Sequence, residues 1–163
     1  MCCSPLSRTP SHPHPFITHN LSLIQVPLFM PYILRHCDVT ELLVPICYLM
    51  LDGRKDPSKV GLLYLCTFML LKLSGERNFG VACNKPYLLR LPVDVPVFSG
   101  NHADLLIVVL HKLVVGGIDK LSALYNCFLT IVCNISPYCK TLSSVASSKL
   151  ISLISLFSSP RFL

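Results

Sequence analysis

Residues 73–112 form the least generic segment of the chain and read LSGERNFGVACNKPYLLRLPVDVPVFSGNHADLLIVVLHK. The segment begins where one apolar helical pattern stops and ends inside the next one. Between these patterns the residues are polar, and Pro92 and Pro96 are spaced four residues apart. Prolines remove backbone donors and disfavour regular strand pairing. The pattern therefore predicts one long, extended crossing between two buried helices.

Signals for helix starts and ends appear on both sides of this crossing. Asp38 with Glu41 three residues later resembles a capping box. Asp56 stands as an N-cap residue before Pro57 at the first helical position, and Gly75 is the expected C′ residue of that helix. These signals and the apolar spacing predict helices over roughly 38–52, 57–74, 101–115, 121–135 and 143–157, after a short broken helix within 21–34.

The apolar stripes of these helices indicate how they pack. The helix at 121–135 carries one stripe at spacings of three and four, made of Leu121, Leu124, Tyr125, Phe128, Val132 and Ile135. Residues 60–71 are apolar on both sides, so we expect this helix to be buried nearly all round. Helices with two apolar faces need neighbours on both sides. The predicted fold is all-α, with antiparallel helical hairpins stacked as part of an α-solenoid of armadillo or HEAT type and one long proline-spaced loop.

The predicted organisation has three parts. Residues 1–27 form an irregular, proline-rich leader that we expect to be disordered. Residues 28–158 form a helical-repeat segment, which we expect to be a fragment of a larger domain because its apolar surface exceeds what its own helices can cover. Residues 159–163 form a short tail. No repeat of fixed period is present, so the solenoid rests on helix spacing.

Composition narrows the function classes. Hydrophobic residues make up 52% of the 163 residues and charged residues 13%, which excludes a disordered chain. The net charge of +6 is scattered, whereas a nucleic-acid binder concentrates its basic residues on one face. The longest uninterrupted apolar run, Val60–Leu71, is shorter than the ~20 residues that span a membrane. Two alternatives stay open: a hydrophobic membrane-associated or secreted peptide, suggested by residues 21–34, and a truncated product without independent function.

No pattern for catalysis or cofactor binding is present. The sequence contains no Gly-x-Ser-x-Gly elbow and no glycine-rich phosphate loop. Nine cysteines include no Cys-x-x-Cys pair, and Cys127, Cys133 and Cys139 turn by ~600° per step on a helix, so they cannot share one metal. His111 is interpreted as a residue that compensates the helix dipole or is partly exposed. We expect no enzyme activity, no cofactor, no metal and no small-molecule substrate.

The crossing supplies the only candidate site. Irregular loops on a rigid scaffold often carry binding residues, so a partner-docking loop is one interpretation. The other interpretation is structural: Glu76 and Arg77 form a charge pair at the helix end that closes the loop, and this interpretation is favoured. The candidate docking residues are Glu76, Arg77, Asn78, Phe79, Asn84, Lys85, Tyr87 and Asp94.

The same crossing carries a family resemblance. The motifs are Ser74-Gly75-Glu76-Arg77-Asn78-Phe79-Gly80-Val81, Asn84-Lys85-Pro86-Tyr87, Pro92-Val93-Asp94-Val95-Pro96-Val97-Phe98 and His102-Ala103-Asp104-Leu105-Leu106. They are continued by Leu129-Thr130-Ile131, Ser136-Pro137-Tyr138 and Lys149-Leu150. This pattern resembles the high-temperature-induced dauer-formation protein family, which is related to dymeclin.

The resemblance implies a function and a location. Members of that family are large helical-repeat proteins, peripheral on the cytoplasmic face of the Golgi, which are implicated in sorting to dense-core secretory vesicles and have no known enzymatic activity. The implied partners are other proteins of the trafficking machinery, with the Golgi membrane surface as a further candidate. The family's N-terminal glycine for myristoylation has no counterpart in Met1-Cys2-Cys3, so no lipidation site is predicted.

Overall fold

The structure is a computed structural model that describes residues 29–88, 99–116 and 121–159. Apart from one pair of two-residue strands, this part of the chain consists of helices and turns, as predicted for an all-α protein. The elements, in chain order, are α2 Phe29–His36, α3 Val39–Gly53, η1 Pro57–Lys59, α4 Val60–Ser74, α5 Arg77–Ala82, β1 Pro86–Tyr87, β2 Gly100–Asn101, α6 His102–Gly116, η2 Ser122–Leu124, α7 Tyr125–Ile135, η3 Ser136–Tyr138 and α8 Ser144–Phe157.

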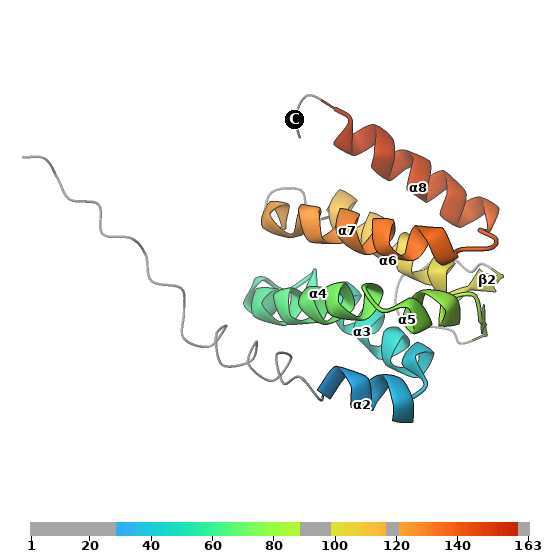
Figure 1. Ribbon diagram of the computed structural model, residues 1–163. Coiled ribbons are helices and arrows are strands. Elements are labelled where there is room, and N and C mark those ends of the chain that lie inside the picture. The colour runs from blue at the N-terminus through green and yellow to red at the C-terminus, as the bar shows by residue number, and fades with distance from the viewer. Residues whose placement is uncertain (1–28, 89–98, 117–120, 160–163) are drawn as a thin grey trace, which may run out of the picture.

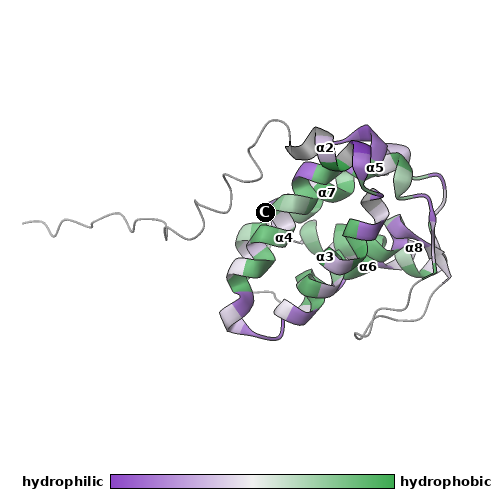
Figure 2. Ribbon diagram, turned by 90° about the horizontal axis from the view of Figure 1, so that it is seen from below, coloured by the Kyte–Doolittle hydropathy of each residue, from purple (hydrophilic) through white to green (hydrophobic). Residues whose placement is uncertain are grey.

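The helices are arranged in layers that follow the order of the chain. α3 packs on α4, α4 on α7, and α6 contacts α3, α7 and α8. α2 and α8 lie at opposite ends of this arrangement (Figure 1). Hydrophobic residues dominate the inner helices, and more hydrophilic residues lie on α5 and at the ends of the helices (Figure 2).

The centre of the core is α6. Every residue from His102 to His111 is buried, because α6 has α3, α7 and α8 packed around it. The expectation that residues 60–71 would be buried nearly all round is confirmed in part. Within this range Gly61 alone is exposed, but full burial is confined to one face of α4, formed by Leu63, Cys66, Thr67, Leu70, Leu73 and Ser74. α4 packs on α3 and α7, and its other face has no comparable neighbour among the described residues.

The expected helix starts are largely confirmed. Asp38 accepts a hydrogen bond from the backbone of Thr40 at 3.0 Å, and Asp56 accepts one from Ser58 at 2.9 Å. The helices expected from 57 and 121 begin with the 3-10 turns η1 and η2. Gly75 follows α4 with a φ of −67°, so the left-handed terminator expected there is not formed. The chain passes from Gly75 directly into α5.

The long extended crossing is corrected in part. Its first portion contains the helix α5, and its described ends pair as antiparallel strands with Pro86 opposite Asn101 and Tyr87 opposite Gly100. The helix forms because Phe79 is anchored in the core, with an exposed fraction of 1%. Asp94, Pro92 and Pro96 lie outside the described residues, as do the predicted leader at 1–27 and all but Ser159 of the predicted tail.

Candidate functional site

The structure separates the eight candidate docking residues into four groups. Four are exposed, namely Glu76, Arg77, Asn78 and Lys85. Asn84 and Tyr87 are half-buried, Phe79 is buried, and Asp94 is outside the described residues. Because Phe79 packs into the hydrophobic core, its ring cannot face a partner in this fold. The side chains that remain available lie mainly on α5.

Asn84 binds another part of the chain through both ends of its amide group. Its Oδ1 accepts a hydrogen bond from the backbone N–H of Lys140 at 2.9 Å. Its Nδ2 donates to the backbone oxygen of Tyr138 at 2.9 Å and to that of Val81 at 3.1 Å. Asn84 therefore has contacts within the fold: its polar atoms hold the segment that connects α7 with α8.

Asn101 and Asp104 hold the same connection from the start of α6. The side chain of Asp104 accepts from the backbone of Asn101 at 2.8 Å, and the side chain of Asn101 accepts from the backbone of Asp104 at 2.9 Å. This reciprocal pair satisfies amides that a helix N-terminus otherwise leaves open. Asn101 also donates to the backbone oxygen of Thr141 at 3.0 Å, and Asp104 accepts from the backbone of Ser143 at 2.8 Å.

We call residues 138–143, which lead into α8, the linker. The three side chains that hold it, Asn84, Asn101 and Asp104, are called the linker clamp. They bind the backbone between Tyr138 and Ser143 at four points, over sequence separations of 39 to 56 residues. The sequence predicted a helix from about residue 101, but it did not predict the contacts of Asn101 and Asp104 with the linker. The spacing of the two residues signals a cap, but no local pattern signals the linker that they hold.

Lys85 and His102 join the start of α3 to this region. The Lys85 ammonium lies 2.6 Å from a carboxylate oxygen of Asp38. Hydrogen bonds from Lys85 and Thr40 lower the pKa of Asp38 to about 2. His102 Nδ1 lies 2.8 Å from the backbone oxygen of Lys85, and its ring meets that of Tyr87 edge to face at 5.7 Å. Lys85 and Tyr87 thus also have contacts within the fold.

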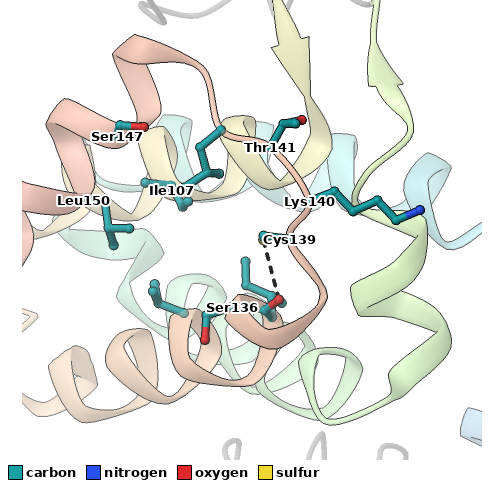
Figure 3. Close-up of a pocket in the computed structure, with 10 residues that line it drawn as sticks. Ile107, Ser136, Cys139, Lys140, Thr141, Ser147 and Leu150 are labelled. Atoms are coloured by element: carbon teal, nitrogen blue, oxygen red, sulfur yellow. Dashed lines mark hydrogen bonds between the residues drawn. The ribbon is translucent and has the colours of Figure 1, made fainter.

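Among the hollows of the described part of the chain, two border the linker, and Thr141 and Leu142 line both. The larger, of about 350 Å³, lies where α6, α7, η3, the linker and α8 meet, and is lined by Ile107, Val132, Ile135, Ser136, Cys139, Lys140, Thr141, Leu142, Ser147 and Leu150 (Figure 3). The smaller, of about 300 Å³, adjoins the linker clamp. In the larger hollow, the Lys140 side chain extends away from Ile107 and Leu150 (Figure 3). The lining combines apolar side chains with the hydroxyl groups of Ser136, Thr141 and Ser147, the Cys139 thiol and the Lys140 side chain.

His111, in the second half of α6, has a different environment from the one expected. His111 is buried, with an exposed fraction of 9%, so the expectation of partial exposure is wrong. Its Nε2 lies 3.1 Å from the Ser152 hydroxyl of α8. Burial, together with the Lys149 charge, lowers the pKa of His111. In the described part of the chain, no three His, Cys, Asp or Glu side chains gather as a metal site, and no helix is long and apolar enough to cross a membrane.

Comparison with known proteins identifies the family. The family model described as Dymeclin: Dyggve-Melchior-Clausen syndrome protein matches residues 22–163. The chain is 53% identical over 135 residues to Protein HID1 of Mus musculus and to Protein HID1 of Homo sapiens, in each case over 83% of this chain. Protein HID1 of Dictyostelium discoideum is 39% identical over 135 residues, again 83% of this chain.

The chain covers only a small part of these relatives, 17% of the two mammalian proteins and 15% of the Dictyostelium protein. No solved structure matches the chain. The family match nevertheless extends through every described helix and across the linker clamp. The chain therefore belongs to the Dymeclin family, within which it is similar to the HID1 proteins.

Proposed function

We propose that this chain is part of a non-enzymatic scaffold that binds other proteins in Golgi-linked membrane trafficking, similar to proteins that act in dense-core secretory vesicle sorting. The observation that carries the proposal is the 53% identity to the mammalian HID1 proteins over 135 residues. Its cellular place is the cytoplasm, peripheral on the Golgi membrane. Its partners are proteins of the trafficking machinery and the Golgi membrane surface.

The helix packing supports a scaffold with the form of an α-solenoid. Consecutive helices pair, α3 with α4 and α6 with α7, and the two pairs face each other through α4–α7 and α3–α6 contacts. In solenoids each such pair contacts its neighbours, and a continuous core is built by addition of further pairs. On this proposal, the chain supplies one portion of such a core.

A non-enzymatic role is supported by the use of the polar side chains. The amide and carboxylate groups of the linker clamp form hydrogen bonds with backbone atoms of the linker. Asp38 and Lys85 pair with each other, and Asp52 pairs with Lys59. These contacts stabilise the fold. The Ser152 hydroxyl lies 3.1 Å from His111 Nε2, but no carboxylate of the described residues is bonded to this imidazole to complete a catalytic triad.

The partner-binding surface of the scaffold is the outer face of α5. Arg77 and Asn78 are exposed there, and Val81, one turn later, is 50% exposed. The α5 backbone is held in place because Phe79 enters the core and Gly80 packs on Tyr138. A mixed apolar and charged face on a rigidly anchored helix suits protein recognition better than binding of a small molecule.

The first experiment tests the location. Cells expressing the tagged chain are fractionated, and the membranes are washed with carbonate. We expect a fraction that sediments with Golgi markers, is released by carbonate, and is digested by protease without detergent. Resistance to carbonate or protection from protease would contradict the proposal and favour the membrane-associated or secreted alternative.

The second experiment tests the α5 surface. Arg77→Glu is compared with Lys72→Glu, which reverses an exposed charge on α4. If the outer face of α5 binds the partner, Arg77→Glu lowers the Golgi-associated fraction several-fold and the control leaves it unchanged, while circular dichroism shows both variants folded. Equal effects of the two substitutions would point to non-specific attraction by net charge.

A further inference from the structure

α8 is attached to the described fold chiefly through one seam. It packs on α6, and lies at the end of the helical stack (Figure 1). Its outward side chains Ile151 and Ile154 are 64% and 58% exposed, so the opposite face makes most of its buried contact. A helix held along one seam opens at a lower free-energy cost than one surrounded by neighbours, such as α6.

The seam contains a titratable group at its centre. His111 of α6 is 9% exposed, and its Nε2 lies 3.1 Å from the Ser152 hydroxyl of α8. A neutral imidazole nitrogen can share one proton with a hydroxyl group in either direction. Lys149 lies three residues before Ser152 on the same helix, is half-buried, and acts on His111 as a like charge.

Among the described residues, the other charged groups near this end of α6 are also basic. Lys112 follows His111 on α6, and Arg54, after α3, donates to the backbone oxygen of Lys112 at 3.4 Å. α7, β1 and β2 carry no charged residue.

The carboxylates of α6 and of α3, which packs on it, do not pair with His111. Asp104 lies at the other end of α6, where it accepts from Asn101 and Ser143. On α3, Asp52 pairs with Lys59, and Glu41 is exposed in the first turn. A proton on His111 would therefore add a second positive charge to the seam, with no carboxylate of residues 29–88, 99–116 or 121–159 paired with it.

We propose that His111 is a proton-sensitive contact that holds α8 on α6 when it is neutral and releases α8 when it is protonated. Release separates Ser152 and Lys149 from the imidazole and uncovers the α6 face that includes Ile107, which lines the larger hollow together with Leu150 of α8. The inference concerns the stability of one helix and does not depend on the proposed trafficking role.

The direction of the effect follows from proton linkage. In the released state His111 is hydrated and titrates near its ordinary value of 6.5, whereas in the docked state burial and Lys149 lower its pKa. The released state therefore binds the proton more tightly. As pH falls below 6.5, opening of α8 increases by at most about tenfold per pH unit, and the increase ends below the docked-state pKa.

Amide hydrogen exchange of the full 163-residue chain tests the proposal. Exchange is measured from pH 7.5 to 5.5 and corrected for the intrinsic pH dependence of each amide. We expect protection of the α8 amides to fall severalfold over this range while that of the α4 amides stays constant. Constant α8 protection, or an equal loss in α4, would overturn the proposal.

Two variants, His111→Gln and Lys149→Glu, and one control, His102→Gln, test whether the effect arises in the seam. His111→Gln keeps a polar group opposite Ser152 and should make α8 protection independent of pH, whereas His102→Gln, at the other end of α6, should keep the wild-type response. Lys149→Glu places a carboxylate in the seam, so acidification should no longer weaken α8. If α8 still loses protection on acidification in both Lys149→Glu and His111→Gln, the proposed role of His111 is refuted.

Discussion

Asp104 and Asn101 bind each other's backbone amides across the first turn of α6, at 2.8 and 2.9 Å, and the same carboxylate holds the backbone of Ser143 at 2.8 Å. Asp104 has an exposed fraction of 1%, so water cannot replace these hydrogen bonds. One buried carboxylate thus joins the N-termini of α6 and α8. The consequence is that the start of the central helix and the start of the last helix depend on one side chain.

The first prediction concerns this carboxylate. Asp104→Ala leaves the amides of Asn101 and Ser143 without their acceptor, and each buried unsatisfied donor costs about 1–3 kcal/mol. We expect the free energy of unfolding in urea to fall by about 2–5 kcal/mol. Asp104→Asn keeps one acceptor oxygen and should lose less. Glu41→Gln, an exposed carboxylate on α3, should change stability by less than about 0.5 kcal/mol, and a similar loss there would contradict the assignment.

The second prediction separates the two interpretations of Asn84. Asn84→Asp can still accept from Lys140 but cannot donate to Tyr138, and Asn84→Leu can do neither. If Asn84 is part of the linker clamp, trypsin cleavage after Lys140 accelerates in the order wild type, Asp, Leu. Asn78→Asp on the exposed side of α5 is the control. Unchanged cleavage in Asn84→Leu would indicate that the residue serves an external partner.

The third prediction uses two glycines in opposite environments. A methyl group at Gly80 would lie 2.9 Å from Cγ of Tyr138, whereas one at Gly61 meets nothing within 4 Å. Gly80→Ala should destabilise the protein by about 1–3 kcal/mol through overpacking. Gly61→Ala, on the exposed side of α4, should stabilise it by about 0.4–1 kcal/mol because the unfolded chain loses freedom. Chemical denaturation measures both, and Tyr138→Ala should relieve part of the Gly80→Ala effect.

The fourth prediction is a pH dependence at the start of α3. Hydrogen bonds from Lys85 and Thr40 lower the pKa of Asp38 from 3.8 to about 2, so its stabilising contribution is present above 3.8 and disappears as pH falls towards 2. Lys85→Met should raise the Asp38 pKa towards its ordinary value and move acid unfolding to higher pH. Carboxyl chemical shifts in an NMR titration report the change. Lys59→Met, which breaks the other ion pair, should leave the Asp38 titration unaltered.

The fifth prediction concerns thiol reactivity. Burial raises the pKa of Cys47, and it raises that of Cys83 to about 12, whereas Cys37 and Cys133 are exposed. Because the thiolate is the reactive form, iodoacetamide should label Cys37 and Cys133 about a hundredfold faster than Cys47 and Cys83 in the native protein. Mass spectrometry of timed samples gives the rates. Rapid labelling of Cys47 would mean that α3 opens far more easily than its packing indicates.

Local signals were sufficient to predict where most helices begin. Asp38, Asp56 and Ser143 each accept a hydrogen bond from an amide two or three residues later. Such contacts are complete within one turn, so the residue types alone reveal them. The stripe predicted for residues 121–135 is also largely confirmed, since Leu124, Phe128 and Ile135 are buried as expected and Val132 is half-buried.

Predictions failed, wholly or in part, where burial depends on distant neighbours. Residues 60–71 and 102–111 are both strongly apolar, but only the second run is surrounded by helices. Phe79 was predicted as a residue of the docking loop, but it is buried because the core lies beneath α5. Periodicity identifies an apolar face, but it does not state how many elements will cover it.

The sequence by itself determined the helical class, most helix starts and the family, because these depend on contacts or motifs within a few residues. Only the tertiary structure decided which polar residues of the 73–112 segment hold the fold. Asn84 meets Lys140 and His111 meets Ser152 over separations of 56 and 41 residues. Such pairs arise from the packing of helices that are distant in the chain, and no spacing of residue types encodes them.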